Sequence, residues 1–371
     1  LDLHCHLREP GSEDAETIVS GTRAALAGGF TRVCAMPNTD PPVDTEAAVR
    51  YQLEKSWRAG NALVLPVGCC TRGRQGLELA EIGSMHAAGA VAVTDDGAWI
   101  ADARVMRRVL EYCKAFDLPV LSHCELAGLD EGSANEGPVA TRLGLATRPG
   151  AGEAAAACRD MLLAELTGSR LHICHVSSAR TVELVRWARK RGAPVTAEAC
   201  PHHFTLTDAA LEGYDSNFKV NPPLRSEADR QAVLEGLADG TLDCIATDHA
   251  PHTRGSKEVE FDAAPAGMTG LETAFSLAYE QLVLSELVSL PRLVALLSIE
   301  PARVLGIEPA RIEPGADAEL VILDLKARWT YSADEVKSKS HNSPFLGREL
   351  CGRVTGGVLP GGRMWLEPDA A

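Results

Sequence analysis

Short apolar runs alternate with longer amphipathic stretches along most of this chain, and this rhythm limits its fold more than any other feature. Eight runs have the length and composition of buried strands: 1–7, 31–37, 63–69, 90–95, 119–124, 171–176, 194–200 and 242–247. Six stretches between them carry apolar residues at helical spacing: 13–27, 45–58, 101–116, 152–166, 179–191 and 226–237. Eight strand–helix units predict an α/β protein, a (β/α)₈ TIM-type barrel. An open, doubly wound sheet would show the same alternation.

The rhythm changes in the last third of the chain. Residues 269–305 are predicted to be helical, and three candidate strands follow among Gly- and Pro-rich turns: 315–324, 327–331 and 352–359. So few strands with open edges are marginal alone. We therefore expect a catalytic barrel domain at 1–305 and an incomplete β-sandwich domain at 306–371, whose remaining strands precede residue 1.

The composition excludes several classes of function. The chain of 371 residues has a formal net charge of −15, which argues against a nucleic-acid or anionic-membrane surface. No apolar run approaches the roughly 20 residues that span a bilayer. The eleven cysteines form no Cys-x-x-Cys pair, and several lie in apolar runs where cysteine acts as a small hydrophobe. This usage predicts reduced thiols and a cytoplasmic protein.

The first predicted strand carries a His-x-His pair, His4 and His6. Side chains two residues apart on a strand share a face, so both imidazoles aim at one point while Cys5 turns away. Two imidazoles at one point suit a borderline divalent metal such as zinc. Taken alone, such a pair is more often an ordinary polar face.

Polar residues recur where the predicted strands end. They are His4, His6, Arg8, Asn38, Asp95, Asp96, His123, His175, His202, His203, Asp248, His249 and, shortly after, His252. In a barrel these ends meet on one face, where active sites lie. Four imidazoles and two carboxylates from five strands would suit one or two zinc ions with a position open for water.

Seven motifs in this order and spacing resemble the amidohydrolase superfamily, and together they resemble its type I dihydroorotases. The motifs are HCHLREPG at 4–11, MPNT at 36–39, DDG at 95–97, SHCE at 122–125, HVSS at 175–178, NPPLR at 221–225 and TDHAPH at 247–252. The resemblance extends from residue 1 to about residue 360. It implies the reversible cyclisation of N-carbamoyl-L-aspartate to L-dihydroorotate, a step of de novo pyrimidine (UMP) biosynthesis.

The resemblance also implies roles for individual residues. One metal would be held by His4 and His6 and a second by His123 and His175, with Asp96 between the two metals and Asp248 beside the first. The substrate would be bound by Arg8, Asn38, Asn221, His252, Ala266 and Gly267. Of these, Arg8, Asn38 and His252 would hold the carboxylate and Asn221 the carbamoyl end. Asp95 is the competing choice for the bridging position.

The chemistry of these groups agrees with that activity. Opening a cyclic amide at neutral pH needs a strong nucleophile, and zinc lowers the pKa of bound water from about 15.7 to about 7. We expect metal-bound hydroxide to attack the amide, with Asp248 as general base and then as general acid toward the leaving nitrogen. The guanidinium of Arg8 offers a planar fork for a carboxylate.

Two alternatives remain open. Hydantoinases and allantoinases, which are related cyclic amidases, often bridge their metals with a carboxylated lysine, but this chain has no lysine between Lys55 and Lys114. A catalytically silent paralogue would serve as a structural partner of aspartate carbamoyltransferase, but such paralogues typically lose metal ligands that are all present here.

We further expect a small-molecule substrate, a homo-oligomer and a possible aspartate carbamoyltransferase partner. The polar loop 253–266 is a candidate lid over the active site, and an ordinary solvated loop is the equal alternative.

Overall fold

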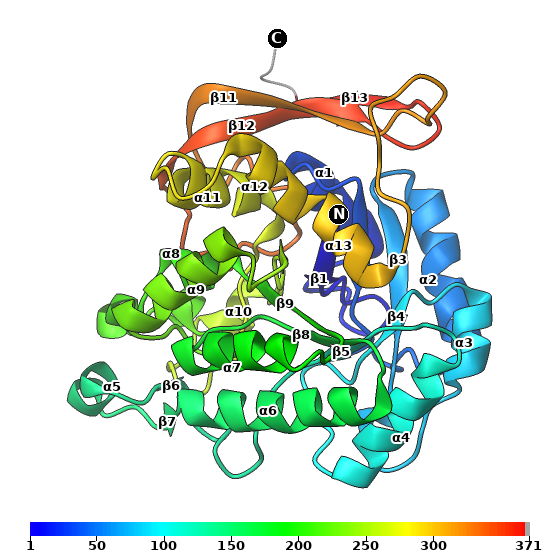
Figure 1. Ribbon diagram of the computed structural model, residues 1–371. Coiled ribbons are helices and arrows are strands. Elements are labelled where there is room, and N and C mark those ends of the chain that lie inside the picture. The colour runs from blue at the N-terminus through cyan, green and yellow to red at the C-terminus, as the bar shows by residue number, and fades with distance from the viewer. Residues whose placement is uncertain (368–371) are drawn as a thin grey trace.

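The computed structural model describes residues 1–367 and shows a parallel barrel surrounded by helices (Figure 1). Within these residues the main sheet has eight strands, in the order β1 (Asp2–Cys5), β2 (Arg32–Ala35), β3 (Leu63–Gly68), β4 (Ala92–Val93), β5 (Val120–Ser122), β8 (Leu171–Ile173), β9 (Val195–Ala199) and β10 (Cys244–Ile245). The barrel closes between β1 and the chain after β10, where Cys5 and His249 form a parallel bridge and the His6 N–H donates to His249 O at 2.8 Å. The predicted TIM-type barrel is confirmed.

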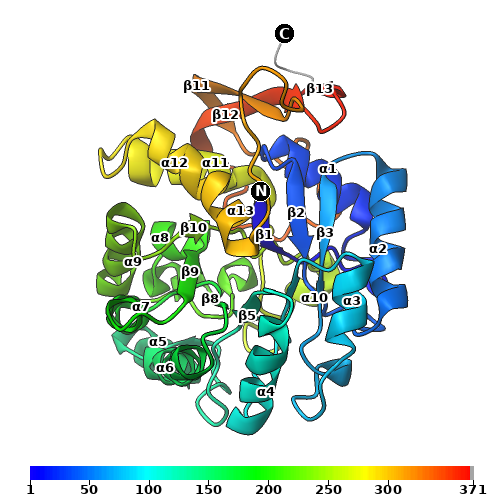
Figure 2. The ribbon, with the colours of Figure 1, turned by 45° about the vertical axis from the view of Figure 1, so that its right-hand side comes forward.

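Most helices lie outside the barrel (Figure 2). The longer ones are α1 (Ile18–Ala27), α2 (Glu46–Ala59), α3 (Ile82–Ala88), α4 (Ala103–Lys114), α6 (Gly150–Thr167), α7 (Ala179–Lys190) and α9 (Glu227–Asp239). The six predicted helices correspond to α1, α2, α4, α6, α7 and α9, whereas α3 was not predicted. Helix α1 begins at Ile18, later than predicted, because Thr17 and Ser20 form a capping box that ends the preceding loop.

The stretch 269–305 is not one continuous helix, although its composition favoured helix throughout. It contains a 3₁₀ turn (Leu271–Thr273), α11 (Ala274–Ala278), a π-helical turn (Tyr279–Val283), α12 (Leu290–Leu297) and α13 (Ile299–Leu305). Pro291 and Pro301 each lie in a first turn, where a missing N–H does no harm; farther along a helix proline would break it. Three short helices lie in loops: α5 (Pro138–Leu143), α8 (Pro201–Thr205) and α10 (Arg254–Lys257).

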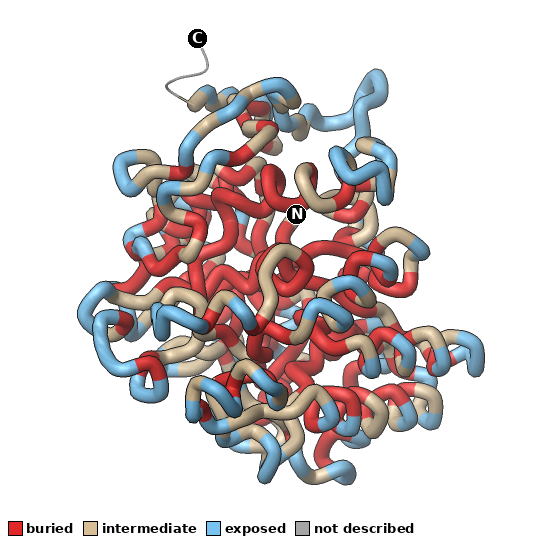
Figure 3. The backbone as a smooth tube through the Cα atoms, turned by 90° about the vertical axis from the view of Figure 1, so that its left-hand side faces the viewer, coloured by how far each residue is buried: buried red, intermediate tan, exposed pale blue. Residues whose placement is uncertain are grey.

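The barrel interior is filled by apolar side chains from the strands and closed at one end by α13. Leu3 packs there with Met36 and with Val304 and Leu305 of α13. Cys5 packs instead with Ile18 of α1 outside the barrel, because the pairing of β1 with β2 shifts register between Asp2 and Cys5. Figure 3 shows the buried residues concentrated in the interior of the molecule, with most exposed residues at its periphery.

The C-terminal residues form a three-stranded antiparallel sheet in the described part of the chain. Its strands are β11 (Leu320–Thr330), β12 (Glu349–Val358) and β13 (Met364–Leu366). The strands expected at 315–324 and 327–331 are one strand, β11, and β13 was not predicted. Between β11 and β12 the chain returns to the barrel, so the tail is not confined to the sheet. The domain boundary after residue 305 stays a prediction.

A short parallel pair, β6 (Ala134–Asn135) and β7 (Thr147–Arg148), lies in the connection between β5 and α6 and was not predicted. No helix in residues 1–367 combines the length and the apolar character needed to cross a membrane.

Candidate active site

The six side chains expected to hold metal lie together at the C-terminal ends of the barrel strands. They are His4 and His6 at β1, Asp96 after β4, His123 after β5, His175 after β8 and Asp248 after β10. All six are buried. The same parallel arrangement that predicted one face for these residues therefore places them in one cluster.

Asp96 lies at the centre of this cluster. One carboxylate oxygen, Oδ1, is 3.2 Å from His4 Nε2, 3.5 Å from His123 Nδ1 and 3.8 Å from His175 Nε2. The other, Oδ2, is 3.5 Å from His6 Nε2. Nitrogens from both histidine pairs thus face a single carboxylate.

Asp248 lies beside the first histidine pair only. Its Oδ1 is 3.1 Å from His6 Nε2 and 3.6 Å from His4 Nε2. Burial opposes ionisation of this carboxyl group, but the hydrogen bond from His6 and the nearby His4 hold its pKa below the ordinary range. Asp248 is therefore a carboxylate at neutral pH and can accept a proton.

Three of the histidines are oriented by hydrogen bonds from their outer ring nitrogens. The acceptors are Glu198 for His4 Nδ1 at 3.1 Å, Asn38 for His6 Nδ1 at 2.8 Å and Glu125 for His123 Nε2 at 3.1 Å. A neutral ring that donates through its outer nitrogen keeps the lone pair of its inner nitrogen for a metal. Such outer contacts are characteristic of histidines that bind metal.

The cluster fits a divalent metal. His4 Nε2 and Asp96 Oδ1 are both buried and lie 3.2 Å apart, yet neither has a hydrogen-bond partner among the described residues. Two groups of side chains each offer three donor atoms that lie within 4.8 Å of one another. One group is His4, His6 and Asp248, and the other is His4, Asp96 and His175. Imidazole and carboxylate donors suit zinc and similar ions.

Three predicted site residues have a strained backbone. Arg8, His175 and Asp248 have φ of 60°, 35° and 46°, in the left-handed region that non-glycine residues rarely adopt. Such a conformation costs on the order of 1–3 kcal/mol and persists only where the surroundings impose it. Next to Asp248, the N–H and hydroxyl of Thr247 donate to the Asp2 carboxylate at 2.9 and 2.6 Å and fix the turn.

Of the two neighbouring aspartates, only Asp96 faces the histidines. Asp95 accepts hydrogen bonds from the N–H of Thr71 at 3.0 Å and from its hydroxyl. The structure therefore gives Asp95 a different set of partners, as expected for adjacent residues at the end of a strand.

Arg8, Asn38 and His252 gather on the His6 side of the cluster. Arg8 Nε donates to Pro251 O at 3.1 Å, and one terminal nitrogen of Arg8 is 3.5 Å from His252 Nε2. Burial and the Arg8 charge lower the pKa of His252 to about 3, so its ring is neutral. Its Nε2–H donates to Ala266 O at 2.9 Å. An anion bound here would meet its positive charge mainly on Arg8.

Gly267 belongs to the same wall and must be glycine. Its φ is +137°, and a Cβ there would lie 2.9 Å from His252 Nε2 and 2.8 Å from the Cβ of Ala250. Any side chain would displace His252. Gly267 therefore serves the site by leaving room for that ring.

Asn221 lies on the His123 side of the cluster. Its Nδ2 donates to Glu125 Oε1 at 3.1 Å and is 3.4 Å from His123 Nε2. Glu125 also pairs with Arg148. Burial raises the pKa of Glu125, but His123 and Arg148 outweigh it and lower the value to about 2.

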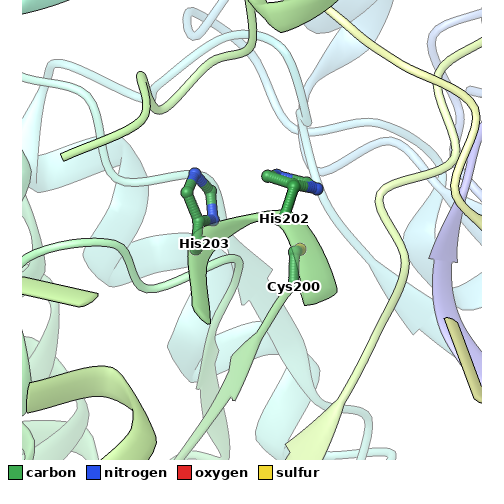
Figure 4. A group of neighbouring side chains, drawn as sticks. All are labelled: Cys200, His202 and His203. Atoms are coloured by element: carbon green, nitrogen blue, oxygen red, sulfur yellow. The ribbon is translucent and has the colours of Figure 1, made fainter. Parts of the chain in front are cut away.

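The two histidines that end the seventh predicted strand form a separate group with Cys200 (Figure 4). His202 and His203 lie on α8 and are buried, and burial lowers the pKa of His203 to about 4. His203 Nε2–H donates to Pro222 O at 3.0 Å, which ties α8 to the turn carrying Asn221. His203 thereby helps to hold the turn that carries Asn221.

The candidate lid loop contains α10 and is anchored at its far end. The buried ammonium of Lys257 donates to Pro265 O at 2.9 Å and to Gly267 O at 3.0 Å. Whether the loop opens stays a prediction.

Glu198, which was not predicted from the sequence, accepts a hydrogen bond from the outer ring nitrogen of His4. Its second oxygen accepts from His172 Nε2 at 3.0 Å, so this buried carboxylate joins two histidines. The signal was available, because a lone carboxylate inside an otherwise apolar strand must be paired. Glu125 was visible only as part of the SHCE motif.

Comparison with known proteins decides the family. The family model described as "Dihydro-orotase-like" matches residues 1–181. The dihydroorotase of Pelotomaculum thermopropionicum is 50% identical over 99% of this chain and 86% of its own length. This chain belongs to the dihydroorotase family. The dihydroorotase of Anaeromyxobacter dehalogenans is likewise 50% identical, over 100% of this chain and 86% of its own.

Solved structures outside the dihydroorotase family share the fold. The L-hydantoinase (dihydropyrimidinase) of Arthrobacter aurescens superposes with a TM-score of 0.85 at 27% identity, over 99% of this chain and 85% of that one. The dihydropyrimidinase of Brevibacillus agri has a TM-score of 0.84 at 25% identity, over 99% and 83%. Their lower identity places these cyclic amidases farther from this chain than the dihydroorotases.

Proposed function

We propose that this protein is a zinc-dependent dihydroorotase that interconverts L-dihydroorotate and N-carbamoyl-L-aspartate. The observation that carries the proposal is the cluster around Asp96, in which nitrogens from His4, His6, His123 and His175 face one carboxylate. Family membership at 50% identity supports the reaction. The enzyme is a hydrolase of cyclic amide C–N bonds.

The metal would be held by this cluster, with His4, His6 and Asp248 at one position and His123 and His175 at the other, and Asp96 between them. When bound, zinc lowers the pKa of water and polarises an amide carbonyl. Glu198, Asn38 and Glu125 keep His4, His6 and His123 in the tautomers that binding requires.

Asp248 serves as the proton carrier. Its low pKa and its position beside His6 make it a carboxylate. When the ring is opened, this carboxylate accepts a proton at Oδ from the attacking water. The same oxygen returns the proton to the departing ring nitrogen, which would otherwise leave as an unstable anion. In the direction of ring closure the two transfers run in reverse.

Arg8 selects and orients the substrate. A half-buried guanidinium whose Nε donates to Pro251 O keeps its terminal nitrogens for a carboxylate. Asn38 gives its carbonyl to His6, which leaves its amide N–H groups for the same ligand. Asn221 on the other side of the cluster would meet the carbamoyl end.

A hydantoinase-like activity is the alternative, since the solved structures above include cyclic amidases whose names specify hydantoin or dihydropyrimidine rings. Those rings carry no carboxylate. A substrate without a carboxylate would cover the half-buried Arg8 without pairing its charge, which is costly. The carboxylated substrate is therefore favoured.

A substrate panel tests this assignment. The zinc-loaded protein should open L-dihydroorotate with a kcat/KM at least about 10²-fold above that for 5,6-dihydrouracil, because the latter leaves Arg8 without its partner. Ring opening is followed by the loss of ultraviolet absorbance. Equal or greater turnover of dihydrouracil or hydantoin would overturn the assignment in favour of the alternative.

All eleven cysteines lie in residues 1–367 and are free thiols, which supports the cytoplasmic location expected from the sequence. A homo-oligomeric state and an aspartate carbamoyltransferase partner stay predictions.

A further inference from the structure

The chain between β11 and β12 lies against the loops at the C-terminal face of the barrel, and four of its polar residues are buried there. Ser338, Ser340, Asn342 and Ser343 are each no more than 4% exposed. The hydroxyl of Ser340 donates to Ala15 O at 2.6 Å, and Phe345 packs with Met268. This segment, residues 337–345, is therefore part of the barrel's active face although it belongs to the C-terminal tail.

Asn342 uses its whole side-chain amide on the two loops that form the carboxylate end of the site. Its Nδ2 donates to Ala250 O and to Gly267 O, both at 3.1 Å. Its Oδ1 accepts from the His252 N–H at 3.0 Å. Both N–H groups and one of the two lone pairs of the carbonyl oxygen are therefore in use.

These bonds join the two loops that carry His252 and Gly267. The loops after β10 and before α11 pair only as far as Ala250, whose N–H donates to Met268 O at 2.8 Å, and Asn342 joins them where that pairing ends. One loop carries His252, and the other carries Ala266, whose carbonyl accepts the ring N–H of His252. Fixing both backbones fixes the direction of that ring beside Arg8.

We propose that Asn342 is a positioning residue for substrate recognition: it holds the His252 and Gly267 loops at the spacing that Arg8 needs to bind the carboxylate. This inference rests on the proposed function. Asparagine suits the task because aspartate lacks the two donors. Alanine would leave the Ala250 carbonyl and the His252 N–H unsatisfied, and Gly267 O would keep only its bond from Lys257.

The test compares Asn342→Ala and the isosteric Asn342→Asp with wild type and with Ser343→Ala. Ser343 is the matched control because it is buried in the same segment, but within residues 1–367 its hydroxyl oxygen accepts a hydrogen bond only from the N–H of Phe345, at 3.3 Å. For both Asn342 variants KM for dihydroorotate should rise about 10-fold or more with kcat within about 3-fold, since contacts to the carboxylate hold substrate and transition state alike. Ser343→Ala should behave as wild type.

Bound zinc and Tm are measured on every variant. Retained zinc with a raised KM supports the inference. A KM within about 2-fold of wild type in folded Asn342→Ala or Asn342→Asp overturns it, as does a parallel loss of kcat and zinc, which would mark a purely structural residue. If zinc-loaded wild type and Ser343→Ala fail to open dihydroorotate, the proposed function itself fails, and that result is distinct.

Discussion

Replacing Asp248 by asparagine is expected to lower kcat by about 10²- to 10⁴-fold, the usual contribution of a positioned proton carrier. The amide keeps an oxygen near His6 Nε2, where the carboxylate oxygen lies at 3.1 Å, so most of the metal should stay bound. The amide cannot accept a proton at neutral pH, so the transfer to the ring nitrogen is lost. Stopped ring opening with retained zinc, measured on the same sample, is the expected result.

The control for this change is Asp117→Asn. Asp117 is exposed and pairs with Arg170 on the surface at 3.2 Å, so the same chemical change there should leave kcat unaltered. Wild-type turnover by Asp248→Asn would remove Asp248 as the proton carrier. If Asp248→Asn loses both its zinc and its turnover, Asp248 acts instead as a metal ligand.

Replacing Arg8 by methionine is expected to lower kcat/KM for dihydroorotate about 30-fold or more, which corresponds to roughly 2 kcal/mol for the loss of a charge-assisted contact. Methionine preserves much of the aliphatic stem but offers no donor. The loss should appear chiefly as a higher KM. Because the cation no longer faces His252, whose pKa it depresses, that pKa should also move upward.

Arg23→Met provides the matched control, because Arg23 is exposed on α1. Its kinetics should equal those of wild type. If Arg8→Met binds dihydroorotate normally, the carboxylate lies elsewhere and the recognition scheme around His252 and Asn342 falls with it.

The sequence predicted the barrel and the meeting of histidines and carboxylates at its strand ends, for a physical reason. Parallel strands bring their C-terminal ends to one face, so a regular series of strands predicts which residues meet there. His4 and Asp248, far apart in the chain, are both at such ends, and the structure places their side chains 3.6 Å apart.

Contacts across the tertiary structure could not be predicted in the same way. No local pattern marks Asn342, because its three partners lie 75 to 92 residues away and the segment around it has no regular periodicity. The start of α1 was placed too early for a related reason. The helical spacing extends through Glu16, but this residue turns inward to His249 at 3.2 Å instead of joining the helix.

The cluster around Asp96 is expected to open dihydroorotate only when it holds metal. The decisive measurement is ring opening by protein freed of metal with a chelator, verified as metal-free by elemental analysis, and then titrated with zinc. We expect no turnover by the metal-free protein and recovery that reaches a plateau by two equivalents of zinc per chain. Full turnover by verified metal-free protein would contradict it.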